Sequence, residues 1–230
     1  MRDFRIDARL LSVAKFVRQG ANFADIGTDH AYLPLSLLKE GRIRRAIASD
    51  INEGPLASAR ANAEAAGVTE GIKFILADGA ASLADEDCDD IAIAGMGGEL
   101  IADIISRADF LKDGKIRLIL QPMTRQGHLR SFLAREGFNI EAEDYSYSAG
   151  KYYVTICASY TGEERSIDAI EAELGKREFL LPLTEEKREF LTKKRNSYKK
   201  ISDGKRAGGE SGEPELSLYL YINELLGGSV

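Results

Sequence analysis

Three aspartates stand at the ends of successive short apolar runs. Asp25 lies within the run at residues 23–26, whereas Asp50 and Asp78 each follow a later run. Such runs are typical of buried strands, and the carboxyl ends of parallel strands meet at one edge of a sheet, where open α/β folds bind ligands. Carboxylates there accept hydrogen bonds from an ammonium group, from ribose hydroxyls or from an exocyclic amine. The three acids therefore predict a nucleoside site.

The turn after the first run has one glycine, Gly27, which permits a tight bend into a helix expected at about residues 30–39. A dinucleotide site needs Gly-x-Gly-x-x-Gly, but Asp29 and Tyr32 occupy the second and third glycine positions. This argues against NAD. A ligand without phosphates fits better, such as the amino-acid end of S-adenosylmethionine (SAM), whose ammonium group seeks a carboxylate.

The later strand ends add to this interpretation. Asp50 lies 23 residues after Gly27, where a Rossmann-type site places a carboxylate for ribose hydroxyls, although capping of the next helix is the alternative. Asp78 is placed to meet the exocyclic amine of an adenine. A fourth apolar run leads into Gly95-Met96-Gly97-Gly98. A cluster of glycines at a strand end indicates close approach to the backbone.

The order of the apolar runs predicts the fold. Five strand–helix units are followed by two strands joined at Ser148-Ala149-Gly150, a hairpin turn. The predicted strands are at residues 23–26, 46–48, 72–76, 91–94, 116–120, 138–147 and 151–160. We therefore expect an α/β, Rossmann-like, seven-stranded fold, the class I SAM-dependent methyltransferase variant, and not the six-parallel-strand dehydrogenase form.

Helical patterns flank this sheet. Residues 5–18 form an amphipathic helix that caps the core, with arginines that alternatively touch a substrate backbone. Residues 1–161 are predicted as the SAM-binding catalytic domain and 162–230 as a C-terminal helical, coiled-coil-like extension. In the extension a helix begins near Thr184, a flexible linker covers residues 204–214, and a last helix completes an antiparallel hairpin or short coiled coil.

Composition sets limits on the function. The 230 residues carry a net charge of −6, which argues against nucleic acid, but residues 176–206 hold 11 Lys and Arg against 5 Asp and Glu. Local basicity matters more, because phosphate contacts are short-ranged in salt. The charged N-terminal residues and the lack of a long apolar run predict a cytoplasmic protein outside membranes. Cys88 and Cys157 have no metal-ligand spacing, so we expect reduced thiols and no metal.

Four motifs carry a resemblance to a known family. They are Asp25-Ile26-Gly27-Thr28-Asp29-His30-Ala31-Tyr32-Leu33-Pro34, Asn52-Glu53-Gly54-Pro55, Ile93-Ala94-Gly95-Met96-Gly97-Gly98 and Leu118-Ile119-Leu120-Gln121-Pro122. In this order they closely resemble the bacterial tRNA (adenine-22 N1)-methyltransferases, the TrmK family, over about two thirds of the chain. The resemblance implies SAM as cofactor, tRNA as partner and no stable protein partner. Met123 departs from the Gln-Pro-Asn form of the last motif, and its thioether cannot donate a hydrogen bond as an amide would.

The strand ends and the resemblance together predict the site. The cofactor-binding set is Asp25, Gly27, Thr28, His30, Asp50, Ile51, Asn52, Asp78, Gly79, Ala94, Gly95 and Met96. The substrate-binding set is Tyr32, Gly97, Gly98, Gln121, Pro122, Lys193, Lys194, Lys199 and Lys200.

Asp29 is the predicted catalytic residue. Methylation of adenine N1 needs positioning more than a base, but its product is cationic and a carboxylate stabilises that charge. The alternative for Asp29 is an N-cap of the following helix. Tyr32 either stacks on a flipped adenine or packs half-buried, and His30 either orients the base or fills the first helical turn.

Two other classes of function remain open from the sequence. The chain could methylate another RNA or a small molecule, with the extension as an oligomerisation module. It could also be a non-catalytic SAM-binding scaffold, although the three strand-end acids and the glycine-rich fourth turn argue against this.

Overall fold

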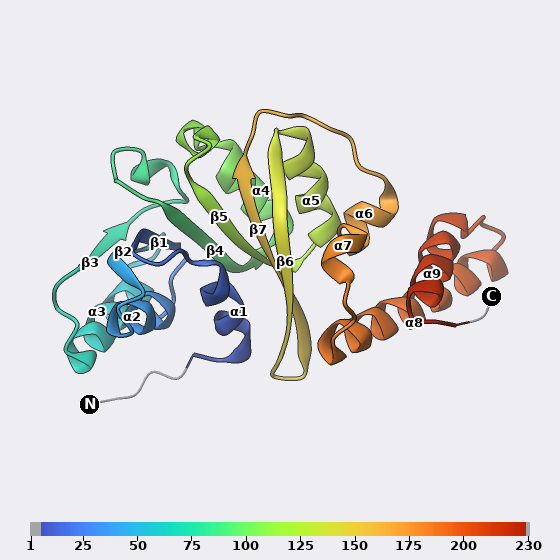
Figure 1. Cartoon of the computed structure of the whole chain (residues 1–230), viewed down its shortest axis with the longest axis horizontal. Coiled ribbons are helices and arrows are strands. Elements are labelled where there is room, and N and C mark those ends of the chain that lie inside the picture. Colours follow the sequence, from blue (N-terminus) through green and yellow to red (C-terminus); the bar gives the residue numbers. More distant parts are fainter. Residues whose placement is uncertain (1–5, 229–230) are drawn as a thin grey trace. The chain divides into compact units, whose positions relative to one another are not determined.

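Seven strands form one mixed sheet in the order β3-β2-β1-β4-β5-β7-β6 (Figure 1). This computed structural model describes residues 6–228. The strands are β1 (Ala21–Ile26), β2 (Ile43–Asp50), β3 (Ile72–Leu76), β4 (Asp90–Gly97), β5 (Arg117–Thr124), β6 (Phe138–Ser148) and β7 (Lys151–Tyr160). β1 to β5 are parallel, and β7 runs antiparallel between β5 and β6. The predicted seven-stranded methyltransferase topology is confirmed.

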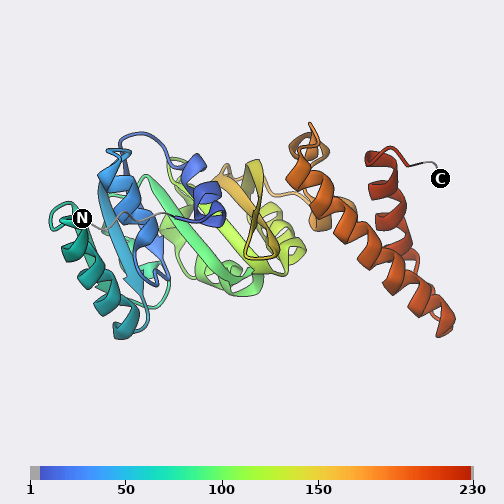
Figure 2. The same ribbon diagram turned by 90° about the horizontal axis from the view of Figure 1, so that it is seen from below.

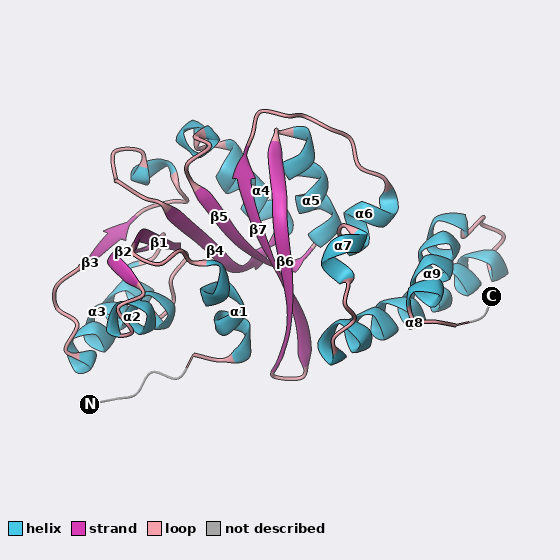
Figure 3. Cartoon of the chain, viewed as in Figure 1, coloured by secondary structure: helices cyan, strands magenta, loops and turns pink. Residues whose placement is uncertain are grey.

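The α-helices between residues 8 and 135 cover the two faces of the sheet (Figure 3). They are α1 (Ala8–Phe16), α2 (Tyr32–Lys39), α3 (Glu53–Ala66), α4 (Gly98–Ser106) and α5 (Gln126–Arg135). The predicted first helix begins at residue 5, which lies outside the described residues. In the structure Asp7 caps α1, because its Oδ1 accepts a hydrogen bond from the Leu10 backbone N–H at 2.9 Å.

α1 and α2 share one buried core with four strands. Val13 of α1 and Val17, which directly follows α1, meet Leu33 and Leu37 of α2 over the face that carries Phe23 of β1. Burying aliphatic side chains of this size contributes about 1.5 to 3 kcal/mol each. α1 is therefore fixed to the sheet by its apolar side.

The chain divides into two compact units between Ser166 and Ile167. The predicted boundary at 161/162 lies in the same connection between β7 and α6, and its assignment to separate functional modules stays a prediction. The elements described in the second unit are the helices α6 (Ala169–Leu174), α7 (Arg177–Leu180), α8 (Glu185–Ala207) and α9 (Glu213–Leu225).

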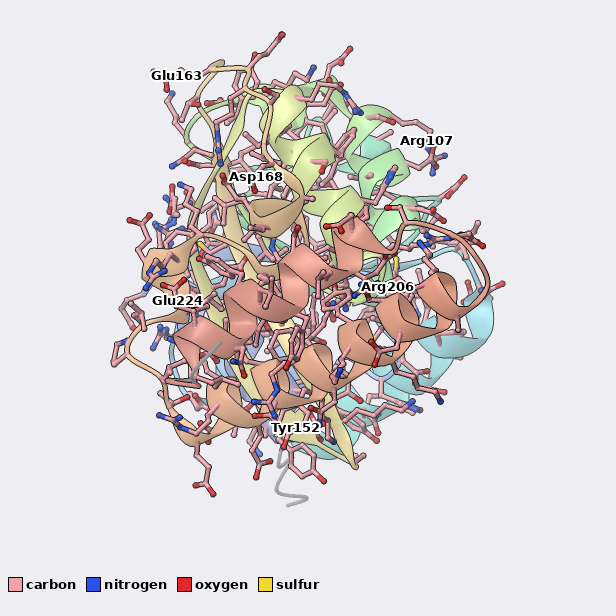
Figure 4. The ribbon with its side chains drawn as sticks, turned by 90° about the vertical axis from the view of Figure 1, so that its right-hand side faces the viewer. Arg107, Tyr152, Glu163, Asp168, Arg206 and Glu224 are labelled. Atoms are coloured by element: carbon pink, nitrogen blue, oxygen red, sulfur yellow. The ribbon has the colours of Figure 1, made fainter. Side chains whose placement is uncertain are left out.

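α8 and α9 form an antiparallel hairpin (Figure 2). Lys205 of α8 pairs with Glu215 of α9 at 2.6 Å, whereas Arg195 reaches Asn223, near the other end of α9, at 3.5 Å. Figure 4 labels Arg206 on α8 and Glu224 on α9. The predicted hairpin is present, and its description as a coiled coil stays a prediction.

The predicted flexible linker at residues 204–214 is wrong in extent. α8 continues through Gly204 to Ala207, and α9 begins at Glu213 with Pro214 in its first turn, where proline is tolerated. Packing explains the longer helix, because Ser202 Oγ donates to the Gly212 carbonyl at 2.9 Å and closes the connection against α8. Among the described residues, no helix is both long and apolar enough to cross a membrane.

Candidate active site

A cavity of about 620 Å³ lies at the carboxyl ends of β1 and β4. Its walls come from the beginning of the described chain and α1, from the turn between β1 and α2, and from the ends of β4 and β5. A cavity of this size accommodates a nucleoside-sized ligand. The predicted site residues that line it are Asp25, Gly27, Thr28, Asp29, His30, Tyr32, Ala94 and Gly95. The structure thus brings together most of the first motif and the beginning of the third.

Asp25 forms a nearly buried acidic point in the cavity wall, with 9% of its surface exposed. Burial raises the pKa of its carboxyl to about 6, although a hydrogen bond with Thr28 and the charge of Arg9 oppose this. The neighbouring carboxylate of Asp50 raises the pKa further. Because a cation would relieve both desolvation and repulsion, this wall favours a positively charged ligand group.

The turn after β1 is fixed by backbone geometry. Gly27 has φ +74°, and a Cβ there would lie 2.0 Å from Met96 Cε. Thr28 donates its N–H to the Ser49 carbonyl at 2.9 Å, and its Oγ1 accepts from the Ala31 N–H at 3.2 Å. Ala31 is left-handed with φ 54°, so α2 begins at Tyr32 and not at the predicted residue 30.

Asp29 projects from this turn with 78% of its side chain exposed. It does not cap α2, because the N-cap position belongs to Ala31 and no side-chain oxygen makes a cap bond there. Asp29 Oδ2 instead lies 3.2 Å from His30 Nε2. The His30 ring stacks on Tyr32 with centroids 5.1 Å apart and an interplanar angle of 25°. One carboxylate and two stacked rings therefore face the same cavity.

Asp50 is the last residue of β2, Ile51 and Asn52 follow it, and all three lie outside the cavity lining. Asp50 Oδ1 accepts a hydrogen bond from the Asn52 backbone N–H at 2.8 Å, so the carboxylate orders the turn into α3. Ile51 is 60% exposed. An exposed apolar side chain beside a turn-held carboxylate is an arrangement that suits the ring and ribose of a nucleoside.

Asp78 also lies outside the cavity lining and is held in an ion pair. Its Oδ2 is 3.1 Å from Arg107 Nη1, at the end of α4. The same guanidinium pairs with Asp103 at 3.0 Å. Gly79 has φ +73°, and a Cβ there would meet Ile104 at 3.5 Å. The predicted contact of Asp78 with an adenine amine would have to share the carboxylate with Arg107.

The glycine-rich end of β4 serves two different purposes. Gly95 has φ +81° and lines the cavity with Ala94. Gly97 and Gly98 lie outside the lining and face the end of β5. A Cβ on Gly98 would come within 2.4 Å of the Arg125 carbonyl oxygen, and one on Gly97 within 3.3 Å of Thr124 Oγ1. These two glycines are explained by backbone packing, and the substrate contact predicted for them stays a prediction.

Gln121 is placed differently from its predicted role. Its side chain is fully buried and lies outside the cavity lining, and its amide bonds to Arg9 and Thr155. Pro122 is also buried, whereas Met123 lines the cavity and is 38% exposed. The direct substrate contact predicted for Gln121 does not fit this burial.

Arg9 is a charged cavity residue that the predicted site sets did not include. The helical spacing of α1 indicated an amphipathic cap, and nothing in the local pattern separated Arg9 from the other basic residues of the segment. The structure places Arg9 in the cavity lining, with a hydrogen bond to Gln121, which is 112 positions away.

The four lysines predicted to contact substrate lie on α8, in the second unit. Lys194 approaches Glu173 at 3.4 Å, and Lys199 pairs with Asp203 at 3.1 Å. Lys193 and Lys200 are exposed. At least two of the four are thus engaged with acids of their own unit.

The chain is similar in sequence and in fold to known methyltransferases. Residues 6–156 match the family model described as a methyltransferase domain. The tRNA (adenine(22)-N(1))-methyltransferase of Bacillus subtilis is 35% identical over 175 residues, which cover 76% of this chain and 74% of that protein. The crystal structure of Streptococcus pneumoniae Sp1610, a putative tRNA (m1A22) methyltransferase, is 34% identical, with a TM-score of 0.84 over 96% of this chain and 100% of that one. The same protein solved with S-adenosyl-L-methionine gives a TM-score of 0.82 over the same shares.

Proposed function

Because the chain belongs to the family of tRNA (adenine(22)-N(1))-methyltransferases, we propose that it methylates N1 of adenine 22 in tRNA, with SAM as cofactor. The observation that carries this proposal is the acid-lined cavity at the strand ends, within the part of the chain that matches the methyltransferase family. SAM supplies a methyl group on a positively charged sulfur.

The residues present fit this cofactor. Asp25 presents a nearly buried carboxylate whose pKa is raised by burial, which suits an ammonium group. Asp50 binds the ribose through the carboxylate that already orders the turn into α3. Ile51 packs on the adenine. Asp78 accepts a hydrogen bond from the adenine amine while its carboxylate stays paired with Arg107. Thr28 and Gly27 hold the turn that separates these groups.

Asp29 acts on the substrate. The N1 lone pair of adenine is already nucleophilic, so the protein has to position the base and no residue has to remove a proton first. N1-methylation leaves a positive charge on the ring. Asp29 lines the cavity and offers a carboxylate that stabilises this charge as it develops. Its pairing with His30 keeps the carboxylate close to the turn.

Tyr32 and His30 recognise the base. A target adenine has to leave its stack to reach a cavity, and aromatic rings compensate for the lost stacking. The two rings are already parallel to within 25°, and both side chains are partly exposed. Tyr32 extends this stack to the flipped adenine, while Met123 supplies an apolar edge.

The α8–α9 hairpin binds the tRNA backbone through its exposed cations. Lys200, Arg188 and Arg206 are exposed on α8 and have no acidic partner within residues 6–228. Phosphate contacts need such free cations and give binding that weakens with salt. A tRNA substrate is consistent with the predicted cytoplasmic location.

Methyl transfer to different acceptors tests the proposal. The protein with labelled SAM is given total bacterial tRNA, free adenosine or a small-metabolite extract. We expect label in tRNA alone. Label in the small-molecule fraction would favour the alternative enzyme class, and SAM binding without transfer to any acceptor would favour a scaffold.

A further inference from the structure

We propose that Arg9 is the receptor for the carboxylate of the cofactor's amino-acid end, and that the buried amide of Gln121 holds it in position. This rests on the proposed binding of SAM in the cavity. It assigns a role to the arginine that lines the cavity and to the glutamine that does not.

Arg9 and Gln121 bond to each other twice. Arg9 Nη1 donates to Gln121 Oε1 at 2.9 Å, and Gln121 Nε2 donates to the Arg9 carbonyl at 3.0 Å. One amide therefore grips both the side chain and the backbone of the same residue. The rotamer of Arg9 is coupled to the position of α1 on the sheet.

A third hydrogen bond fixes which way the amide points. Gln121 Nε2 also donates to Thr155 Oγ1 of β7 at 3.2 Å, and Ser12 of α1 donates to that same hydroxyl at 2.8 Å. With both N–H groups engaged, Oε1 has to face the Arg9 guanidinium. Because Gln121 and Thr155 are fully buried, water does not compete for this arrangement.

The guanidinium keeps donors for a ligand. Arg9 has 25% of its side chain exposed at the cavity, and a guanidinium has five N–H donors. Gln121 occupies one of them, and the Asp7 carboxylate is 3.8 Å from Nε. A Cβ on Gly95 would lie 3.7 Å from Nη1, so the glycine keeps the β4 turn close beside the guanidinium.

The charges around Arg9 select a zwitterion. A simple anion bound to Arg9 would be repelled by Asp25, whose pKa responds to the charges of both Arg9 and Asp50. An amino-acid group carries its own ammonium, which Asp25 accepts, together with a carboxylate for Arg9. Planar guanidinium–carboxylate pairing adds orientation to this attraction.

The test compares two ligands that differ only in the carboxylate. Calorimetry measures S-adenosylhomocysteine and its decarboxylated analogue, which keeps the amine, on the full chain. We expect the parent to prefer the first ligand about 10- to 100-fold, as for a lost charged hydrogen bond. Arg9→Gln should reduce the preference to less than about threefold. Arg9→Lys, which keeps the charge without the planar fork, should be intermediate.

A matched pair of variants separates Gln121 from general anchoring of α1. Gln121→Met should lower the ligand preference about as much as Arg9→Lys, with little further effect in an Arg9→Gln background. Ser12→Ala removes a neighbouring anchor of α1 on Thr155 and should leave the preference unchanged. Should Gln121→Met fail to fold, Gln121→Asn keeps the amide but is too short to reach Arg9, and the same loss is expected.

Different results would overturn the role proposed for Arg9 and the role proposed for Gln121. Equal affinities of the parent for both ligands, or an equal loss of both in Arg9→Gln, would remove Arg9 as the carboxylate receptor; tRNA binding weakened in that variant would assign Arg9 to RNA instead. An unchanged preference in the Gln121 variants would leave Gln121 as a structural residue. No binding of either ligand by the parent would refute the proposed function itself.

Discussion

The cavity at the carboxyl ends of the strands and the α8–α9 hairpin hold their charged side chains in opposite ways. In the cavity, burial raises the pKa of Asp25 to about 6, with repulsion from Asp50 added. In the hairpin, the ion pair with Lys205 lowers the pKa of Glu215, and Lys199 is paired with Asp203. A carboxylate whose ionised form is destabilised by burial indicates a ligand that stabilises it. A charged group with an ion-pair partner is already neutralised within the fold. Counting charges along the sequence does not separate these cases.

The largest effect is expected at Asp29, in the cavity. Asp29→Asn removes the charge opposite the developing cation and should slow single-turnover methyl transfer by about 100-fold or more. Affinity for S-adenosylhomocysteine should change by less than about threefold. Asp85→Asn, at an exposed position outside the cavity lining, serves as the control. Transfer at the parental rate would remove Asp29 from the mechanism.

The next largest effect is expected in the pH dependence of cofactor binding. Below about pH 6 Asp25 is protonated and no longer attracts an ammonium group, so S-adenosylhomocysteine affinity should fall up to tenfold per pH unit below that value. Asp25→Asn should bind weakly with a flat profile between pH 5 and pH 8, as titrated by calorimetry. A parental profile without a step near pH 6 would contradict the assignment.

The raised pKa of Asp25 also predicts how the stability of the folded protein depends on pH. Between the ordinary pKa of 3.8 and about 6, the folded protein holds a proton on Asp25 that the unfolded chain releases. The free energy of unfolding therefore decreases as pH rises through this window. At pH 8 Asp25→Asn should stabilise the ligand-free protein by up to about 3 kcal/mol, measured by denaturant unfolding. Destabilisation at pH 8 would show that the carboxylate is satisfied without a ligand.

Asp50 gives an intermediate effect. Asp50→Ala should weaken S-adenosylhomocysteine binding by about 1 to 3 kcal/mol, because a ribose hydroxyl loses its acceptor. Asp50→Asn keeps an oxygen for the Asn52 N–H and separates this loss from loosening of the turn. Parental affinity in both variants would exclude Asp50 from the cofactor contact.

The smallest effect is expected on α8, where exposed cations without an acidic partner in the described part of the chain can be compared with cations that are paired. Lys200→Gln with Arg188→Gln removes exposed cations that have no acidic partner among the described residues, and each lost phosphate contact should flatten log affinity for tRNA against log salt by about 0.7 to 0.9. Lys199→Gln with Lys205→Gln removes two cations already paired with acids. The second variant should change the slope less. Equal slopes in both variants would mean that ion pairing within α8–α9 does not determine which cations contact tRNA phosphates.

The sheet and the first motif were predictable because they depend on local pattern. Apolar runs at residues 23–26, 46–48 and 72–76 placed the strand ends, and Gly27 marked the turn. Helix ends were less predictable. Gly204 is a poor helix former, yet packing against α9 carries α8 past it, and the left-handed Ala31 delays the beginning of α2.

The part of the site that sequence reasoning missed depends on long-range contacts. The role of Arg9 is set by Gln121, which is 112 positions away, and that of Asp78 by Arg107 on α4. A buried amide cannot be distinguished from a substrate-binding amide by its motif alone. Gln121 was therefore predicted at the substrate, and the structure places it behind Arg9.

Position-resolved methyl transfer shows directly whether N1 of adenine 22 is the methyl acceptor. Two transcripts of one tRNA, differing only by adenine or guanine at position 22, are incubated with the protein and SAM, and the methylated nucleoside is mapped by mass spectrometry. We predict N1-methyladenosine at position 22 of the first transcript and no methylation of the second. Equal methylation of both transcripts, or a methyl group at another position or atom, would contradict it.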